Sequence, residues 1–248
     1  MHPILLSFGP IHLYAYGAFV ALGVFSAVLF LRKKAGSVFI SSDTMTDLAI
    51  TTVVSGFAGA RLFYVVQFWN YFKTSPIDIF KLWEGGIVLY GGLIGGVLGF
   101  SLFIKFKKLP FLALLDLFVI GTALAQAFGR IGCFFNGCCF GKPTNVPWAV
   151  KFPFLDHAVH PTQFYESFFC FALALFLFRL WLKKTRSGLV AAAYFILYPT
   201  GRFLLEFFRG DNSTVFWNLT LPQWVSLGIM FVTLFLYVYG RKRIHSSS

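Results

Sequence analysis

Seven long apolar stretches limit what this chain can fold into more than any other feature of its sequence. Each covers roughly 20 residues, the length that a helix needs to cross the hydrocarbon core of a bilayer. Hydrophobic residues make up 58% of the chain and charged residues only 12%, against about 25% charged in soluble domains. An outer-membrane barrel would instead show alternating segments of about 10 residues. The sequence therefore predicts an all-α polytopic membrane protein with about seven transmembrane helices, at 11–31, 48–68, 86–104, 110–129, 164–182, 188–208 and 223–240.

The net charge of +12 lies largely in four basic clusters that follow the first, third, fifth and seventh stretches. An excess of lysine and arginine marks the cytoplasmic loops of membrane proteins. We therefore expect the N-terminus outside and the C-terminus in the cytoplasm, and the pattern disfavours nucleic acid as a partner. The clusters hold 12 of the 21 lysines and arginines: Arg32, Lys33 and Lys34; Lys105, Lys107 and Lys108; Lys183, Lys184 and Arg186; Arg241, Lys242 and Arg243.

The connections on the outer side carry the polar and irregular sequence. Residues 69–85 mix aromatic and charged side chains, which predicts a segment lying at the membrane interface. Residues 136–163 are predicted to form an irregular loop and residues 209–221 a polar connection. No linker divides the chain, so we expect a single domain over residues 1–248.

Glycines in the third stretch recur at a spacing of four. Gly91, Gly95 and Gly99 place small residues on one face of a helix, which lets a neighbouring helix approach closely. The same spacing is consistent with room for a lipid or a peptide, and both interpretations stay open at this stage.

Several ionisable side chains lie inside the apolar stretches or at their outer ends. An arginine at a helix centre costs roughly 2.5–3.5 kcal/mol on insertion scales, so such residues are candidates for function. Arg202 and Glu206 are four residues apart on one helix face and can pair, which would by itself neutralise them. On the outer half, however, arginines outnumber carboxylates, and guanidinium groups bind phosphate bidentately. This surplus favours an anionic phospholipid as ligand, bound by some of Arg61, Arg130, Arg202 and Arg209, which stand against Glu166 and Glu206.

Two further polar groups are placed where a helix enters the bilayer from outside. The segment HPTQFYE, from His160 to Glu166, gathers a histidine, a glutamine, a tyrosine and a glutamate. Tyr16 lies near the outer end of the first stretch. A lone tyrosine or histidine at this depth is often an interface anchor, but the density of polar groups makes His160 and Tyr16 candidates for substrate binding.

Six segments together resemble one known family, the bacterial phosphatidylglycerol–prolipoprotein diacylglyceryl transferases. They follow one another along nearly the whole chain in the family's order: FGPIHLYAYG, GARLFYV, WEGGIVLYGGLIGG, GRIGCFFNGCCFG, HPTQFYE and GRFLLEFFRGD. The resemblance implies a reaction at the outer half of the bacterial plasma membrane. The lipobox cysteine of a preprolipoprotein signal peptide attacks the glyceryl carbon of phosphatidylglycerol, a thioether forms and glycerol phosphate leaves. No cofactor and no metal are expected.

The resemblance also implies roles for individual residues. Arg130 matches the arginine of the GR-G signature and is expected to bind the phosphate. Arg202 and Glu206 match the arginine and glutamate of R-x3-EFFR, and both are expected to be essential. The tyrosine of the first span corresponds to Tyr16, and two signature positions correspond to Asn136 and Gly141.

Tyr90 is one departure from the family pattern. Many members have histidine there, a favoured candidate for the general base, but this chain reads LYGG. A tyrosine has a reference pKa near 10, against about 6.5 for histidine, and is a poor proton acceptor at neutral pH. Nearby arginines would lower this pKa. Either Tyr90 hydrogen-bonds the substrate, or the base is another residue such as Glu206 or His160.

The cysteines of the fourth motif are the second departure. Cys133 replaces an asparagine common in the family, and Cys138 and Cys139 follow. Three interpretations compete: a metal site, for which C-x4-C-C is a weak pattern; a disulfide in an oxidising compartment; and packing of reduced thiols.

Other functions are weighed against the transferase. A divergent paralogue would use another lipid donor or thiol acceptor. A transporter of anionic lipids or solutes would be expected to show paired broken helices. A thiol–disulfide oxidoreductase would be expected to carry C-x-x-C.

Overall fold

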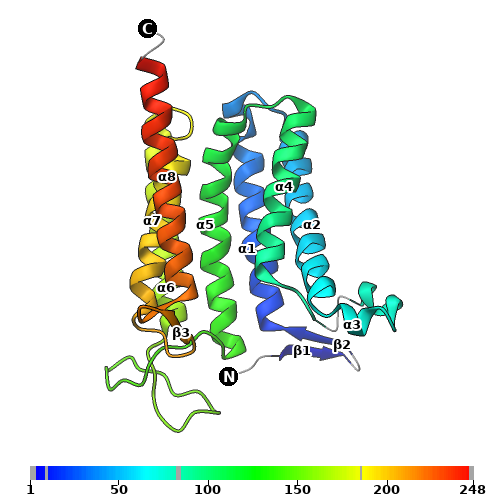
Figure 1. Ribbon diagram of the computed structural model, residues 1–248, viewed down its shortest axis with the longest axis vertical. Coiled ribbons are helices and arrows are strands. Elements are labelled where there is room, and N and C mark those ends of the chain that lie inside the picture. The colour runs from blue at the N-terminus through cyan, green and yellow to red at the C-terminus, as the bar shows by residue number, and fades with distance from the viewer. Residues whose placement is uncertain (1–3, 9–10, 82–84, 185, 246–248) are drawn as a thin grey trace. The chain divides into compact units, whose positions relative to one another are not determined.

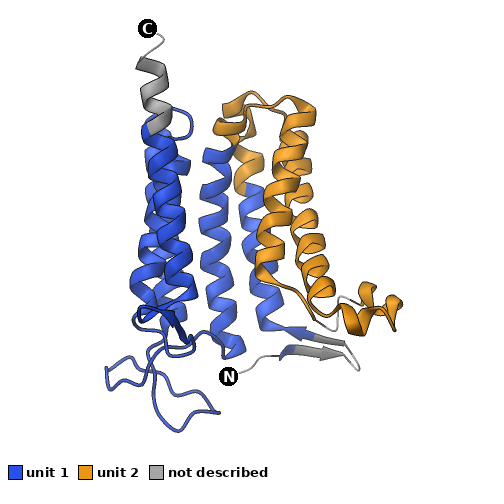
Figure 2. Ribbon diagram, viewed as in Figure 1, with its two compact units in different colours: residues 1–29, 115–248 blue, residues 30–114 orange. Residues whose placement is uncertain are grey.

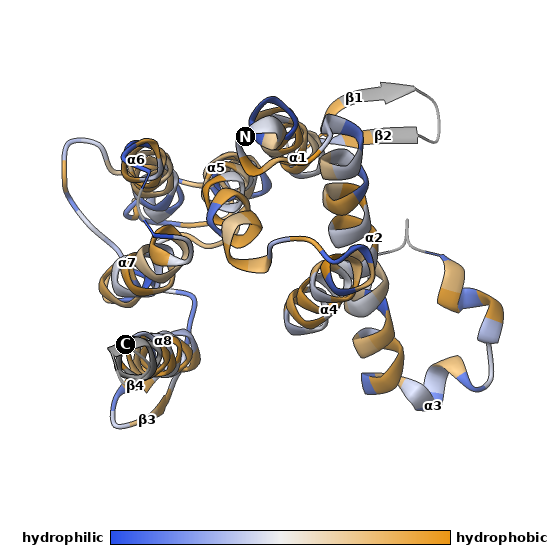
Figure 3. Ribbon diagram, turned by 90° about the horizontal axis from the view of Figure 1, so that it is seen from above, coloured by the Kyte–Doolittle hydropathy of each residue, from blue (hydrophilic) through white to orange (hydrophobic). Residues whose placement is uncertain are grey.

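The computed structural model describes residues 4–8, 11–81, 85–184 and 186–245. Seven helices are long and apolar enough to cross a membrane, which confirms the predicted fold class. Figure 1 shows them as long coiled ribbons, and Figure 3 shows hydrophobic residues on every one of them. The helices are α1 (Ala15–Lys34), α2 (Ser42–Gln67), α4 (Leu89–Lys107), α5 (Phe111–Asn136), α6 (Thr162–Leu182), α7 (Leu189–Glu206) and α8 (Leu221–His245).

The chain folds as two compact units (Figure 2). Residues 1–29 and 115–248 form the first unit, and residues 30–114 form the second. A single domain over residues 1–248 stays a prediction, as does the orientation of the termini.

The second unit is built on helices α2 and α4, which run side by side. Their backbones are so close that a Cβ atom added at Gly95 would lie 2.3 Å from the Ser55 carbonyl oxygen, and one at Gly91 would lie 2.5 Å from the Gly59 carbonyl oxygen. Real Cβ atoms do not approach other atoms this closely, so glycine is required at these positions. The glycine spacing is therefore explained by close helix packing, one of its two predicted interpretations.

The connection from α2 to α4 contains two short helices and no strand among its described residues. They are α3 (Trp69–Phe72) and the 3-10 helix η2 (Pro76–Phe80). Ile77 and Phe80 are among its exposed apolar side chains. A second 3-10 helix, η1 (Ala35–Val38), lies between α1 and α2.

Helices α5 to α8 form the main part of the first unit, where α7 packs against α6 and α8. Polar contacts lock neighbouring helices together. The Ser167 hydroxyl on α6 donates to the Ala127 carbonyl on α5 at 2.8 Å. The Asp116 carboxylate on α5 accepts from the backbone N–H groups of Gly188 and Ala191, both at 2.7 Å. Asp116 thereby caps the start of α7, whose first N–H groups have no partner inside the helix, and this structural task explains a buried acid.

The predicted helix boundaries are wrong at the start of the first span. Residues 11–14 form strand β2 (Ile11–Tyr14), which pairs antiparallel with β1 (Ile4–Phe8), and α1 begins only at Ala15. The alternation of apolar and polar residues in Ile11, His12 and Leu13 suits a strand. Apolar content alone extended the predicted helix into this hairpin.

The connection from α5 to α6 and the connection from α7 to α8, both in the first unit, differ from each other. Residues 137–161 form no helix and pair only through isolated bridges, one of which joins Gly141 to Arg209. This confirms the predicted irregular loop. The connection after α7 instead contains a small hairpin of β3 (Thr214–Phe216) and β4 (Leu219–Thr220). Trp217 and Asn218 both have positive φ (50° and 57°), the conformation of a type I′ turn.

Candidate active site

Helix α5 ends in a Schellman motif that fixes the geometry around it. Gly137, directly after the last helical residue Asn136, takes a left-handed conformation with φ of 71°. The Gly137 N–H donates to the Phe134 carbonyl at 3.1 Å, and the Cys138 N–H donates to the Cys133 carbonyl at 3.2 Å. These two bonds define the motif, in which the second residue past the helix packs against one in its last turn. Cys138 therefore lies beside Cys133.

A third thiol joins this pair. The Sγ atoms of Cys133, Cys138 and Cys139 all lie within 4.8 Å of one another, and the three residues could together hold a metal ion. All three are free thiols, which corresponds to the reduced form. Cys139 also has a left-handed backbone (φ 64°). Hydrogen bonds from the other two thiols, and the guanidinium groups of Arg209 and Arg130, lower the pKa of the Cys139 thiol against the effect of burial.

Two side chains of α6 hold the cysteine loop in place. The Thr162 hydroxyl donates to the Cys139 carbonyl and the Gln163 amide Nε2 to the Cys138 carbonyl, both at 2.7 Å. Gln163 is 1% exposed, and its Oε1 has no hydrogen-bond partner among the described residues. The loop is thus fixed by its backbone. The thiols make weaker contacts: Cys138 Sγ donates to the Cys133 carbonyl at 3.6 Å, and Cys139 Sγ accepts from Arg130 Nη1 at 3.8 Å.

Arg130 lies six residues before the end of α5 and links the thiols to a buried acid. Its Nη2 lies 3.0 Å from Glu166 Oε1 on α6, and its Nη1 lies 3.8 Å from Cys139 Sγ. The Tyr198 hydroxyl on α7 donates to the same Glu166 oxygen at 3.4 Å. The Glu166 side chain is 4% exposed and that of Arg130 is 23% exposed. The charge of Arg130 is therefore balanced by Glu166, and its side chain remains partly exposed.

Glu206, the last residue of α7, is the centre of a second network. Its Oε2 lies 2.5 Å from Arg202 Nη1 and 3.8 Å from Arg209 Nε. Its Oε1 accepts from Asn212 Nδ2 at 2.6 Å and from the Thr220 hydroxyl at 2.7 Å. The structure confirms the predicted contact between Arg202 and Glu206. Glu206 thus connects Arg202 and Arg209 with Asn212 and Thr220.

Arg209 is fixed by Asp211, an acid that was not among the predicted site residues. Asp211 accepts from Arg209 Nε at 2.9 Å and from its Nη2 at 2.6 Å, a bidentate pair. The first unit thus places three arginines beside three carboxylates. The predicted surplus of cations is not present in this unit, because it counted Arg61 and omitted Asp211.

Gly141 lies where three backbone segments meet. A Cβ atom there would lie 2.6 Å from His160 Cβ and 2.8 Å from the Phe208 carbonyl oxygen. Its N–H donates to the His160 carbonyl at 2.9 Å. His160 Nδ1 lies 3.2 Å from the Tyr165 hydroxyl. The predicted residues Gly141, His160 and Arg209 are therefore brought together, and only glycine fits the first position.

Tyr16 and Asn136 are the remaining predicted site residues in the first unit. Tyr16 is the second residue of α1 and is exposed. Its backbone packs against Gly132 on α5, where an added Cβ atom would lie 3.2 Å from the Tyr16 carbonyl oxygen. The Tyr16 ring lies within electrostatic range of Arg130 and Cys133. Asn136 is the last residue of α5 and is exposed next to the cysteine loop.

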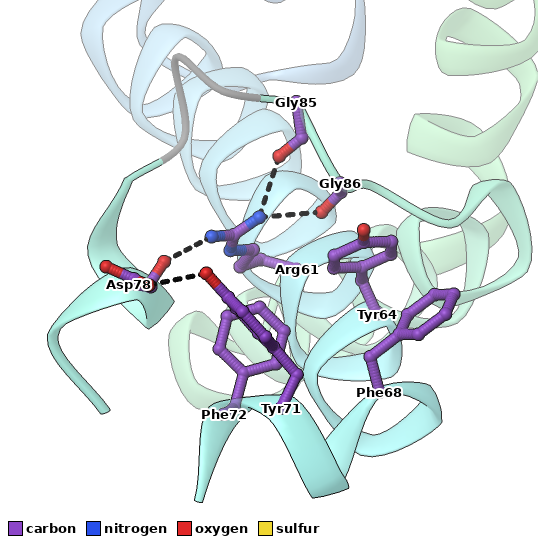
Figure 4. Close-up of a pocket in the computed structure, with 8 residues that line it drawn as sticks. All are labelled: Arg61, Tyr64, Phe68, Tyr71, Phe72, Asp78, Gly85 and Gly86. Carbon is purple, nitrogen blue, oxygen red and sulfur yellow. Dashed lines mark hydrogen bonds between the residues drawn. The ribbon is translucent and has the colours of Figure 1, made fainter. Parts of the chain in front are cut away.

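Arg61 and Tyr90 belong to the second unit. Tyr90 is the second residue of α4 and is 43% exposed. Arg61 on α2 is buried and lines a pocket together with Tyr64, Phe72 and Asp78 (Figure 4). Each of its five N–H donors lies within hydrogen-bond distance of a backbone carbonyl. The acceptors are the carbonyls of Ile79 (2.9 Å), Gly85 (2.7 Å), Gly86 (3.0 Å), Asp78 (2.5 Å) and Lys81 (3.3 Å).

Comparison with known proteins shows which family the chain belongs to. A family model described as prolipoprotein diacylglyceryl transferase matches residues 3–239. The chain belongs to this family. It is 38% identical over 248 residues to the phosphatidylglycerol–prolipoprotein diacylglyceryl transferase of Clostridium tetani (strain Massachusetts / E88), covering 98% of this chain and 99% of that one.

Members of the prolipoprotein diacylglyceryl transferase family from distant bacteria agree in name and length. The enzyme of Synechococcus elongatus (strain ATCC 33912 / PCC 7942 / FACHB-805) is 34% identical over 257 residues, with 97% of this chain and 89% of that one covered. One from Clostridium perfringens (strain 13 / Type A), phosphatidylglycerol–prolipoprotein diacylglyceryl transferase 2, is 36% identical over 239 residues and 93% of each chain. The chain is therefore a multi-pass membrane transferase that acts in the first step of lipoprotein maturation.

Sequence reasoning did not assign functional roles to several residues that complete the site. Tyr198, Asp211, Asn212 and Thr220 contact its charged groups. Their sequence signal is weak because tyrosine, threonine and asparagine are ordinary residues at helix ends and in turns. Glu166 was noticed as a buried charge, but only the fold shows that its partner is Arg130.

Proposed function

We propose that this chain transfers the diacylglyceryl group of phosphatidylglycerol to the lipobox cysteine of a preprolipoprotein signal peptide. The cysteine sulfur forms a thioether with the glyceryl carbon. The bond from that carbon to the phosphate oxygen breaks, and glycerol phosphate leaves with the electron pair. Family membership supports the reaction, and the environment of Arg130 is the structural observation that carries the assignment of the site.

Arg130 is proposed to bind the phosphate of the lipid. Its two side-chain partners among the described residues are one carboxylate and, at 3.8 Å, one thiol. A guanidinium group has five N–H donors, so donors remain for a phosphate oxygen. Negative charge grows on the leaving oxygen as the bond breaks, and a fixed cation beside it lowers the barrier. Glu166 holds the guanidinium in position before the lipid arrives.

Arg202 is proposed as a second cation for the phosphate, with Glu206 as its anchor. Glu206 is 3% exposed and binds Arg202, Asn212 and Thr220. Its carboxylate is therefore proposed to orient Arg202. Arg209 is held by Asp211, and its backbone pairs with that of Gly141. It is proposed to lie near the same lipid headgroup.

We propose a role for each of the remaining predicted residues. Tyr16 and Asn136 are proposed to hydrogen-bond the lipid headgroup, and His160 to contact the substrate through its ring. Tyr90 is proposed to donate a hydrogen bond to the substrate. Arg61, with its donors engaged by backbone carbonyls, is proposed to position the connection that leads into α4 rather than to bind phosphate.

The site is proposed to open toward the outer leaflet of the bacterial plasma membrane. Within the first unit, the basic cluster that begins with Lys183 lies just beyond the end of α6, whereas the cysteine loop is held by the first residues of that helix. Cytoplasmic ends of membrane helices carry such clusters. Arg202 and Glu206 lie at the other end of their helix from the nearest cluster, which supports an outward-facing site.

A mass assay tests the proposal. The purified protein is reconstituted with phosphatidylglycerol and a synthetic lipobox peptide, and we expect the peptide cysteine to gain one diacylglyceryl group. The Arg130→Ala protein should lose the gain by about 100-fold or more. Arg179→Ala is the matched control, because Arg179 is an exposed arginine in the last turn of α6. Failure of the folded wild-type protein with phosphatidylglycerol, but success with another anionic lipid, would replace the proposed donor.

A further inference from the structure

The three-thiol cluster at the end of α5 has a geometry that reduced cysteines do not need for packing. Two of the thiols, those of Cys133 and Cys138, are paired by the Schellman motif. The third is brought in by a left-handed backbone at Cys139, a conformation that costs a non-glycine residue about 1 kcal/mol or more. A disulfide would use two sulfur atoms, so it does not explain why a strained residue adds a third.

The distances suit a metal ion of the thiophilic class. A tetrahedral zinc site has Zn–S bonds of about 2.3 Å, so neighbouring sulfur atoms lie about 3.8 Å apart. The three Sγ atoms here lie within 4.8 Å of one another, and small side-chain rotations would close the difference. The site is accessible, because Cys138 and Cys139 are only half-buried while Cys133 is buried.

The charge around the cluster fits bound thiolates. Three thiolates and one divalent cation carry a net charge of −1, which requires a compensating cation in a membrane protein. Arg130 Nη1 lies 3.8 Å from Cys139 Sγ. The arginine would therefore stabilise the anionic complex rather than repel the metal.

We infer that Cys133, Cys138 and Cys139 bind a divalent thiophilic cation, for which zinc is the best fit, and leave its fourth position open. The described residues offer three thiol ligands at this place and no histidine or carboxylate within the same group. Three protein ligands with an open fourth position are typical of catalytic zinc sites. The open position is the place for the thiol of the acceptor peptide.

This role rests on the proposed function and supplies the step for which no base is evident. A thiol that coordinates zinc is deprotonated outright. The peptide thiol would release its proton to water as its sulfur binds the metal. The peptide thiolate would then form the C–S bond with the glyceryl carbon, while the C–O bond breaks and its electrons leave with the phosphate, which Arg130 would hold next to Cys139. Tyr90 in place of histidine would then not impair proton removal.

Metal binding is tested first, without any activity. The reduced, purified protein is titrated with Co²⁺, a spectroscopic substitute for Zn²⁺, and the thiolate charge-transfer absorption is recorded. We expect one ion per chain in the wild type and binding at least about tenfold weaker in Cys139→Ala. Cys170→Ala is the matched control, because Cys170 is a free, buried cysteine on α6 outside the cluster.

A second readout uses the wild-type protein alone, in case a variant fails to fold. Zn²⁺ should slow the alkylation of Cys138 and Cys139 by a maleimide, as located by peptide mass spectrometry. A folded wild-type protein whose three thiols are reduced, but which binds neither Co²⁺ nor Zn²⁺ and shows no protection, would overturn the inference.

The role of the open position is tested by adding peptide to the Co²⁺-loaded protein. A lipobox peptide should increase the charge-transfer absorption as a fourth sulfur binds, and the same peptide with serine for cysteine should not. Equal transfer by zinc-loaded and chelator-stripped protein would overturn the activation step while the proposed function stands. Metal binding without any transfer from phosphatidylglycerol would leave the metal site supported and count against the proposed function.

Discussion

Two buried or half-buried arginines, one in each unit of the molecule, show opposite uses of the same side chain. Arg61 in the second unit has all five N–H donors within hydrogen-bond distance of backbone carbonyls. Arg130 in the first unit contacts one carboxylate and one thiol, and its side chain remains 23% exposed. The first arginine satisfies backbone carbonyls with its donors, and we propose that the second presents a fixed cation to a ligand.

The difference shows that a charge inside a membrane protein is not by itself a sign of ligand binding. In both cases the desolvation of the guanidinium is offset. Around Arg61, the dipoles of backbone carbonyls offset this cost. The positive charge remains, but every N–H donor is engaged. A single carboxylate offsets it with opposite charge and leaves donors available. The number of unused donors therefore separates a positioning residue from a phosphate ligand.

The largest expected effect concerns the acids that keep the arginines of the first unit neutralised. Glu206→Ala would leave Arg202 without its 2.5 Å partner in a buried environment. Removing one member of a buried pair costs about 3–5 kcal/mol, so we expect a large fall in the thermal unfolding midpoint in detergent. Glu206→Gln keeps an acceptor for Asn212 and Thr220 and should be milder. Equal stability of the alanine variant and the wild type would contradict the network.

The next effect compares the two arginines as lysines. Arg130→Lys keeps the charge but loses the bidentate geometry, so we expect kcat/KM for diacylglyceryl transfer to fall about 10- to 100-fold while the protein stays folded. Arg61→Lys should act mainly on stability, because a lysine has three donors for the five carbonyl contacts. The comparison breaks if Arg61→Lys raises the KM for phosphatidylglycerol as strongly as Arg130→Lys does.

A more local effect is expected when Arg61 is removed altogether. In Arg61→Ala the carbonyls of Asp78, Ile79 and Gly85 lose their common donor, at about 1–3 kcal/mol for each group that water cannot reach. The connection between α2 and α4 should then open locally. Limited trypsin digestion should cut faster at Lys73 and Lys81 in this variant than in the wild type. Unchanged digestion would mean that other contacts hold this segment.

The smallest effect is a pH dependence of the same connection. Hydrogen bonds from the Lys81 ammonium and the Tyr71 hydroxyl lower the pKa of Asp78 below its ordinary value of 3.8. Because this pKa is depressed in the folded state, its stabilising contribution is present above pH 3.8 and is lost as the pH falls through the lower, folded value. Pepsin should therefore cleave this segment faster as the pH falls through that range.

The Asp78→Asn protein provides the control for this dependence. It lacks the carboxylate that pairs with Lys81 at 2.7 Å, so its cleavage rate should change less across the same range. A wild-type profile identical to that of Asp78→Asn would show that this contact does not stabilise the connection.

The sequence by itself determined the fold class and, through its motifs, the family. Span length and charge asymmetry are local properties, because a helix in lipid must satisfy its own backbone. They were sufficient to predict seven membrane-spanning helices, although residues 11–14 form a strand. The pair of Arg202 and Glu206 was also predictable, because residues four apart on a helix are neighbours.

Only the tertiary structure decided how each charge is balanced and where the thiols meet. Arg130 and Glu166 are 36 positions apart on different helices, and no local rule links them. Arg61 looked like a phosphate ligand until the fold surrounded it with carbonyls. The spacing of Cys133, Cys138 and Cys139 was weak evidence for a site until a left-handed turn at Gly137 brought the sulfur atoms together. The physical reason is that backbone direction after a helix end, and packing between helices, set these distances, and neither is a property of residue type alone.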